Sequence, residues 1–523
     1  MISNKLVKRF LTFIIEVLFL GFFLGVQSNI IPIPPTLKNI IILSAITLLL
    51  AIILFCLKFL WPRLPNKPKK PVILTVGIAS ILTIILFIVL VWSQQDICLT
   101  SAKLEKYIST GERSLTQKET LDEKDREQQI YDNNKDLNEN NSYLLALAIP
   151  AKTEPQAAKA MLAGVADAQT KFNQPYNDPT KPRISKKLLK IVVVDDQNNE
   201  DKFAEKVACQ IAQNPNILGV IGHHSSGSSK AALDTYAKAG ITMITPTSTS
   251  TKLNQNSGKV FFRTTVTNAD LGEILARRIA NLDSKVSVFY EGSNEYAEDL
   301  KEQFIKFLSP IRIAEEHDIK YWNNTHIDRL AIPNNVKAAV IFSSSGKSQK
   351  HEIAIKLIKK LKRTRPDLQL FGGDSLYKGS TLYDGKTDIE GLKLVIPWFP
   401  VKSDGQIISD YATKSAATWG GPINWMTASS YDATQAFLVA IAQIEQTSRR
   451  KVDRKSVLDF MPNVYLEQKD TSGAGLKFDN GEPKDFDNGE PKDRKPIFVE
   501  VVQKEKLPKI LQCNLKVCFK PVE

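Results

Sequence analysis

The sequence predicts a two-lobed α/β domain of parallel sheets flanked by helices, preceded by about three transmembrane helices. Three observations support this fold class. The first 93 of the 523 residues are far more apolar than the rest. From residue 142 onward, short strand-like runs alternate with helical runs, which is typical of βαβ units and a parallel sheet. The alternation occurs in two successive series, as expected for two lobes.

Residues 1–93 are predicted to form a membrane anchor, because they contain three apolar runs at about residues 10–26, 40–60 and 71–92. Each run is close to the ~20 residues that a helix needs to cross the ~30 Å hydrocarbon core. The first run contains Glu16, so a signal-like or interfacial segment is the alternative there. Lys and Arg cluster before the first run and after the second, which places the N-terminus in the cytoplasm and the residues after the third run outside. No cleavage site or lipobox stands out, so we expect the anchor to be retained.

Residues 94–141 are polar and charged, with few large apolar side chains available for a core. We predict a linker here, with partial helix near residues 102–107. The domain at 142–523 opens with the first α/β series. Its strands are predicted at 143–150, 188–194, 217–221 and 241–245, and its helices at 153–172, 200–211 and 226–239.

The second series is predicted to form another lobe. Its helices are expected at 268–282, 295–308 and 351–361, and its strands at 286–290, 338–342, 368–371 and 497–502. Lobe 1 should comprise about 142–264 and 396–470, and lobe 2 about 267–394 and the C-terminal part. Crossing segments are expected near Thr265, near Leu394 and at 470–480. Since ligands bind beyond the carboxyl ends of strands in open α/β sheets, the two lobes can face each other across a cleft.

Charge and motifs exclude several function classes. The net charge is +13, but Lys and Arg are scattered among Asp and Glu without a basic, aromatic-rich stripe, so we expect no nucleic-acid partner. Anionic membrane lipid is the expected neighbour of this charge. No Walker A, GxSxG, HExxH or kinase motif is present, so an enzyme is not expected, and no cofactor is implied.

The five cysteines lack the spacing of a metal site, so no metal is expected. Cys513 and Cys518 are close enough for a small disulfide loop in an oxidising compartment, and two unpaired thiols are the alternative. The segment FDNGEPKD at 478–485 is repeated at 486–493. Its acidic residues do not follow an EF-hand pattern, which favours a tolerated loop insertion over a calcium site.

Four motifs, in order, resemble the branched-chain amino acid (Leu/Ile/Val) binding proteins. These are type I periplasmic binding proteins that serve ABC transporters, and the resemblance covers roughly residues 142–505. The motifs are ILGVIGHHSSGSSKAALDTYAKAGITMITPTSTSTKL at 217–253, VFFRTTVTNADLG at 260–272, VSVFYEGSNEYAEDL at 286–300 and LQLFGGDSLY at 368–377. The resemblance implies the type I periplasmic-binding-protein fold for the two lobes.

The resemblance implies three ligand contacts in lobe 1. In the family, a serine in the turn after Gly-His helps to bind the ligand α-carboxylate, and this position resembles Ser226. A helix N-terminus there would favour an anion; an N-cap serine without ligand is the alternative. A family carbonyl that accepts from the ammonium corresponds to Thr247, and a threonine that donates to the carboxylate corresponds to Thr249. A polar loop that caps the next turn is the alternative for both.

Two further contacts are implied in lobe 2. An acidic residue that pairs with the ligand ammonium corresponds to Asp374, in the FGGD turn. A partly desolvated carboxylate in a cleft needs a cationic partner, whereas a solvated loop Asp or a helix cap is the alternative. Tyr296 resembles a family tyrosine that closes over the ligand, and ordinary packing between the lobes is the alternative.

The sequence departs from the family at several positions, which leaves the ligand's identity open. The first βα loop reads KTEPQAAKAM, with Ala157 and Ala158 in place of glycine and an aromatic residue. The side-chain pocket is therefore expected to be wider or less closed. Asn198 and Ser225 lie near the positions of the family's early disulfide. Serines stand where family members can carry aromatics, at Ser343, Ser344 and Ser345.

Together these features predict a membrane-anchored, extracytoplasmic solute-binding protein. It would capture a small, amino-acid-like ligand by closure of two lobes for ABC-type uptake, with an ABC permease as partner. Two alternatives remain. One is a ligand-sensing receptor subunit that signals through a partner protein, and the other is a non-binding scaffold with the same fold.

Overall fold

The computed structural model describes residues 105–116, 125–177, 185–256, 259–282, 284–344, 349–447, 451–473, 475–478, 495–507, 511 and 513–522. All of these belong to the compact unit Gln94–Glu523. The three predicted spans, at 10–26, 40–60 and 71–92, lie outside the described residues. Among the helices that are described, none combines the length and hydropathy needed to cross a membrane.

Lobe 1 is built on a six-stranded sheet with the order β1-β3-β2-β4-β5-β6. Strands β2 to β6 are parallel, and the short β1 is antiparallel to β3. The strands are β1 (Ile108–Ser109), β2 (Ser142–Ile149), β3 (Leu188–Asp195), β4 (Ile217–Ile221), β5 (Thr242–Thr245) and β6 (Phe261–Arg263).

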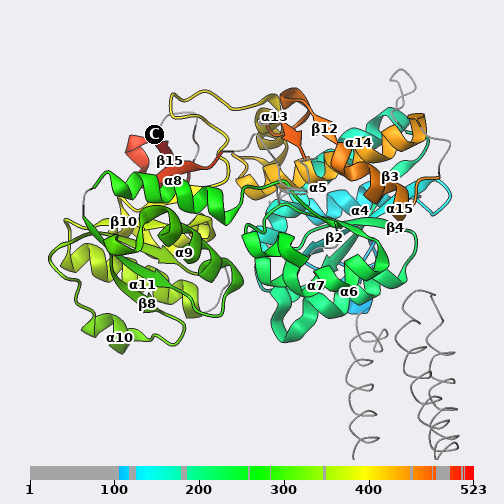
Figure 1. Ribbon diagram of the computed structural model, residues 1–523. Helices are drawn as coiled ribbons and strands as arrows, with labels where there is room; N and C mark the ends of the chain where they lie inside the picture. The colour runs from blue at the N-terminus through cyan, green and yellow to red at the C-terminus, as the bar shows by residue number, and fades with distance from the viewer. Residues whose placement is uncertain are drawn as a thin grey trace, which may run out of the picture. The chain divides into compact units, whose positions relative to one another are not determined.

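Helices cover both faces of this sheet (Figure 1). The core around α5 (Pro155–Asn177) and α14 (Trp425–Thr447) contains Leu145 and Leu147 of β2. Ala146 and Ala148 of the same strand pack into the second core, with α6 (Phe203–Gln213) and α7 (Ser226–Ala239). Because β2 is buried on both faces, its sequence is a continuous apolar run without polar alternation.

Lobe 2 is built on a seven-stranded sheet with the order β15-β14-β11-β10-β9-β7-β8. The strands β7 to β11 are parallel, whereas β14 and β15 add antiparallel. The strands are β7 (Lys285–Tyr290), β8 (Ile313–Asp318), β9 (Val336–Phe342), β10 (Gln369–Gly372), β11 (Lys393–Ile396), β14 (Ile497–Gln503) and β15 (Val517–Val522). One core includes α8 (Asn268–Ala280) and α9 (Glu295–Leu308), and the other α11 (Gln349–Thr364) and α12 (Gly379–Gly385).

Two separate sheets confirm the predicted two-lobed α/β fold. The orders β3-β2-β4-β5 and β8-β7-β9-β10-β11 are equivalent, because in each lobe the first strand of the series lies between the second and the third. Such a reversal of strand order is where open α/β sheets form a crevice at their carboxyl ends. The loops after β2 and β4 in lobe 1, and after β7 and β9 in lobe 2, therefore flank the expected site.

The N-terminal part of the domain differs from the predicted linker at 94–141. Helix α4 (Arg126–Asn134) and strand β1 pack on lobe 1. The buried Asn134 amide donates to the Ile191 carbonyl at 2.7 Å and accepts from the Ile191 N–H at 3.0 Å. Leu115, Ile130 and Tyr131 of the same segment pack into the lobe 1 core. Hydropathy missed this packing because these few apolar residues are surrounded by polar ones, some of which bind backbone groups.

The chain crosses from lobe 1 to lobe 2 at residues 264–267, between β6 and α8, and returns after β11. The third predicted crossing, at 470–480, ends with Phe478 as its last described residue. Phe478 is buried in lobe 1 and packs edge-to-face on Phe262, with ring centroids 4.9 Å apart. The remainder of the FDNGEPKD repeat lies outside the described residues. Cys513 and Cys518 form a disulfide, the first of the two alternatives left open by the sequence.

Candidate functional site

The loop after β4 is held by a chain of buried polar groups. His223 Nδ1 lies 2.6 Å from the carboxylate of Asp196, and His223 Nε2 lies 3.0 Å from the Tyr236 hydroxyl. All three side chains are fully or almost fully buried. Local sequence does not reveal this acidic partner, because Asp196 and His223 are 27 residues apart in the chain. Asp196 follows β3, and the carboxyl ends of β3 and β4 lie at the same edge of the sheet.

The same loop positions Ser226 as the first residue of α7. The N-cap is Ser225, whose hydroxyl accepts from the Ser228 N–H at 3.1 Å. The alternative of Ser226 as the N-cap is therefore wrong. The buried Ser226 hydroxyl instead accepts from the Ser250 N–H at 3.3 Å, which ties the helix N-terminus to the loop after β5.

The loop after β5 supplies the two predicted threonines, and their hydroxyls differ. The Thr247 hydroxyl donates to the His224 carbonyl at 2.7 Å. The Thr249 hydroxyl is buried and has no hydrogen-bond partner within the described residues. Because a buried hydroxyl without a partner costs about 1–3 kcal/mol, the Thr249 hydroxyl, unlike that of Thr247, is available to bind a ligand or water.

In lobe 2 the two predicted residues contact each other. The Tyr296 hydroxyl donates to the Asp374 carboxylate at 2.7 Å. Gly373 makes this approach feasible, since a Cβ atom there would lie 2.2 Å from the Tyr296 hydroxyl oxygen. Asp374 is only 4% exposed, and burial raises its pKa to about 6, although the bond from Tyr296 acts in the opposite direction.

Several contacts join the two lobes beside these residues. Asn268 connects the predicted halves, because its backbone N–H donates to the Thr249 carbonyl at 2.6 Å and its side chain donates to the Tyr296 carbonyl at 3.1 Å. Lys230 of α7 pairs with Glu295 of α9 at 2.7 Å. These bonds bring Thr249 and Tyr296 to one region. No printed contact joins Ser226 or Thr247 directly to Asp374, so the sharing of one cleft by all five predicted residues remains a prediction.

A pocket of about 650 Å³ opens between the lobes and contains residues that sequence reasoning missed. Lobe 1 contributes the turn between β2 and α5, with Glu154 and Gln156, and lobe 2 contributes α11, α12 and the residues around them. Lys378, four residues after Asp374, is one of the charged residues that line it. Burial lowers the pKa of Lys378, and the charges of Glu154 and Asp384 oppose that shift. The position of Glu154 at the end of the loop between β2 and α5, at the reversal of strand order, is the signal that could have identified it.

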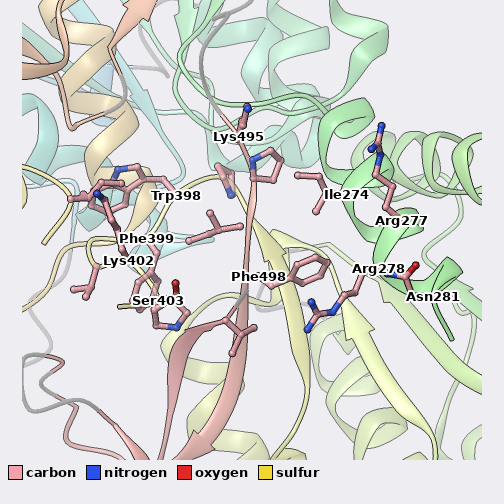
Figure 2. A pocket seen from close by; sticks show the side chains of 17 residues that line it. Ile274, Arg277, Arg278, Asn281, Trp398, Phe399, Lys402, Ser403, Lys495 and Phe498 are labelled. Atoms are coloured by element: carbon pink, nitrogen blue, oxygen red, sulfur yellow. The ribbon is translucent and has the colours of Figure 1, made fainter. Parts of the chain in front are cut away.

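A second pocket, of about 690 Å³, lies where the chain crosses between the lobes (Figure 2). Trp398, Phe399 and Ser403 lie on one side of it, and α8 contributes Ile274 and Arg278 on the other. None of the predicted site residues lines this pocket. Among the described residues, no cluster of His, Cys, Asp and Glu is arranged to hold a metal ion.

A model of the periplasmic binding protein family matches residues 156–482. The chain belongs to this family. Membership agrees with the two equivalent sheets and with the polar residues at the carboxyl ends of their strands. Periplasmic binding proteins capture solutes and catalyse no reaction, which confirms that the chain is a solute-binding protein and not an enzyme. No match was found among curated proteins.

Solved periplasmic binding proteins share the fold at low identity. LivJ from Streptococcus pneumoniae, in complex with isoleucine, is 15% identical with a TM-score of 0.56, over 73% of this chain and 99% of that one. The leucine binding protein LivK from Thermotoga maritima is 19% identical with a TM-score of 0.56, over 72% and 97%. A solute-binding protein from R. palustris, in complex with benzoate, is 16% identical with a TM-score of 0.55, over 73% and 97%.

Proposed function

We propose that this periplasmic binding protein captures an amino acid between its lobes for ABC-type uptake. The environment of the Asp374 side chain gives the strongest support for this proposal. Its carboxylate is buried, and within the described residues it is hydrogen-bonded to the Tyr296 hydroxyl and ion-paired with no cation. An ammonium group of a ligand would supply the missing charge, because a desolvated carboxylate is stable only when it is paired or protonated.

We call the five predicted ligand contacts the clamp: Ser226, Thr247 and Thr249 in lobe 1, and Tyr296 and Asp374 in lobe 2. Its lobe 1 half suits a carboxylate. The Thr249 hydroxyl has no partner in the described chain, and Ser226 opens helix α7, whose first N–H groups and dipole favour an anion. Thr247 would contribute its carbonyl rather than its hydroxyl, which is already used by the His224 carbonyl. A zwitterion bound in this way would satisfy charges on both lobes and so favour their closure.

The membrane anchor and the transport partner are part of the same proposal. The three apolar runs at 10–26, 40–60 and 71–92 and their flanking Lys and Arg support three spans in the lipid, with the binding domain outside the cytoplasm. An ABC permease is the expected partner, since solved relatives with this fold are described as ABC transporter components. A receptor subunit that signals through a partner would use the same clamp, whereas a scaffold would bind no amino acid.

Calorimetric titration of the full-length chain in detergent with the common amino acids tests the clamp. We expect at least one amino acid to bind the wild type, and Asp374→Asn to weaken binding by about 2–5 kcal/mol, which is roughly thirtyfold or more in Kd. Asp388→Asn, at an exposed aspartate of the same lobe, should leave the affinity unchanged. If no amino acid binds the wild type, or if Asp374→Asn binds equally well, the proposal fails.

A further inference from the structure

The pocket between the lobes contains a histidine whose polar atoms are not used by the protein. His351, near the start of α11, lines this pocket and is only 5% exposed. Both of its ring nitrogens are buried and lack a hydrogen-bond partner within the described residues. A buried polar atom without a partner destabilises the protein, so a group in the pocket should bind these two nitrogens.

The charge state of His351 defines what it can bind. Burial, and after it the charge of Lys378, lowers the pKa of His351 to about 3. The imidazole is therefore neutral at pH 7, with one nitrogen that donates and one that accepts. A second donor is available in the same pocket, because Lys378 also lines it.

The pocket that His351 lines is polar where an aliphatic side chain would need apolar walls. Lobe 2 also contributes Lys378 and Ser380 to its lining. From lobe 1, the turn that faces α12 brings Glu154 and Gln156. A leucine or isoleucine side chain would leave the two His351 ring nitrogens without a partner.

We propose that the ligand is an amino acid whose side chain ends in a carboxamide, and that His351 and Lys378 bind this group in the pocket between the lobes. A carboxamide has an oxygen that accepts and an NH₂ group that donates twice. Its oxygen would accept from Lys378 or from the His351 N–H, and its NH₂ group would donate to Glu154 or to the other His351 nitrogen. It also adds no net charge beside the Glu154 carboxylate, unlike a side-chain carboxylate. This inference rests on the proposed amino-acid clamp, which holds the ligand's α-carboxylate and ammonium.

Competitive calorimetry on the full-length chain, with glutamine, asparagine, glutamate and leucine as probes, tests the inference. We expect glutamine or asparagine to bind at least tenfold more tightly than leucine or glutamate. His351→Leu should weaken binding of the amide amino acid at least tenfold and leave leucine binding equal or stronger. His351→Gln, which keeps a donor and an acceptor, should stay within a few-fold of the wild type. His326→Leu, the same substitution at an exposed histidine of lobe 2, is the matched control and should change neither affinity.

The outcomes separate this inference from the clamp on which it rests. If leucine or glutamate binds as tightly as the amides, and Asp374→Asn abolishes that binding, the carboxamide assignment is overturned while the clamp stands. If His351→Leu keeps the amide preference, His351 has no role in specificity. If no amino acid binds the wild type, both proposals are overturned. Should His351→Leu fail to unfold cooperatively, the ranking of the four probes on the wild type and on His351→Gln still decides the matter.

Discussion

Asp374 shows at the scale of one residue how a binding site can work against folding. Its carboxylate is held in a buried position with a tyrosine hydroxyl as its partner, so its charged form is less stable than it would be in water. Such a carboxylate has no opposite charge to pair with until a cation binds beside it. The same feature that would attract an ammonium group therefore lowers the stability of the ligand-free protein.

Replacing Asp374 by Asn should stabilise the ligand-free protein near neutral pH. The pKa of Asp374 is raised from 3.8 to about 6 in the folded state, so the folded state holds a proton at a pH where the unfolded chain has lost it. The loss of stability that comes from burying the ionised Asp374 carboxylate is fully present above pH 6. It disappears as the pH falls toward 4, because the carboxylate is then protonated. We expect Asp374→Asn to increase the free energy of unfolding by about 1–3 kcal/mol at pH 7.5 and to leave it almost unchanged at pH 4.

Urea unfolding of both proteins at the two pH values measures this difference. Asp388→Asn, on the exposed side of lobe 2, is the control and should show no such pH-dependent gain. A loss of stability at pH 7.5, or a gain of equal size at pH 4, would contradict a buried, unpaired carboxylate at position 374.

Gly373 is predicted to be required for the contact between Tyr296 and Asp374. An alanine Cβ there would lie 2.2 Å from the Tyr296 hydroxyl oxygen and 2.9 Å from a methyl group of Leu300. We expect Gly373→Ala to displace the tyrosine, to cost about 1–3 kcal/mol of stability and to weaken amino-acid binding. Gly421→Ala is the matched control, because a Cβ at Gly421 would meet nothing within 4 Å. Equal behaviour of the two variants in thermal melts and titrations would refute the prediction.

At the scale of elements, burial explains which strands and helices could be predicted from the sequence. Strands β2, β3 and β4 are covered on both faces, so each is a continuous apolar run that stands out from its neighbours. Strand β8 has the sequence IAEEHD and lies at the edge of its sheet, half in solvent, and it was missed. Helix α4 was missed because only Ile130 and Tyr131 among its nine residues are apolar and buried, and two of its other buried residues, Glu127 and Asn134, are polar.

The site was predictable only in part, for a related reason. Tyr296 and Asp374 come from motifs that resemble a known family, and the structure brings them into contact. Glu154, His351 and Lys378 come from three separate segments with no shared motif. Only the strand order and the packing of lobe on lobe bring these three residues to one pocket, and neither can be read from local sequence.

The packing of α4 against residues 114–116 should depend on Glu127. This buried carboxylate accepts from the Leu115 N–H at 2.8 Å, from the Thr116 N–H at 2.9 Å and from the Tyr131 hydroxyl at 2.5 Å. Glu127→Ala would leave these donors without an acceptor, so we expect a loss of at least about 2 kcal/mol. Denaturant unfolding measures this loss in the free energy of unfolding. Glu139→Ala, at an exposed glutamate, is the control. A loss below ~0.5 kcal/mol would show that α4 docks without this carboxylate.

At the scale of the whole molecule, the lobes are held together by polar contacts at their facing surfaces. The ion pair between Lys230 and Glu295 lies partly in solvent, with the Lys230 side chain 61% exposed. Deeper contacts accompany it, such as the bonds from the Thr251 N–H and hydroxyl to the carboxylate of Asp299. An exposed pair contributes only ~0–1 kcal/mol, which suits an interface that must open to admit a ligand.

Reversing one charge of this pair should shift the balance between open and closed lobes. Lys230→Glu places two carboxylates together, and we expect a larger radius of gyration for the ligand-free protein in small-angle scattering. A change of ~1 kcal/mol alters an open–closed ratio about fivefold. The double variant Lys230→Glu with Glu295→Lys should restore the wild-type radius. Identical radii for the wild type and Lys230→Glu would argue against the role of this contact in closure.

The docked N-terminal segment also sets where the folded domain begins. Strand β1 extends the lobe 1 sheet by pairing with β3, and Ile130 and Tyr131 of α4 are part of the lobe 1 core. A shorter protein that began at residue 142 would lose this edge strand and would expose the apolar surface that these two side chains cover. The packed part of the domain therefore includes residues well before the first long strand, and a truncation has to respect them.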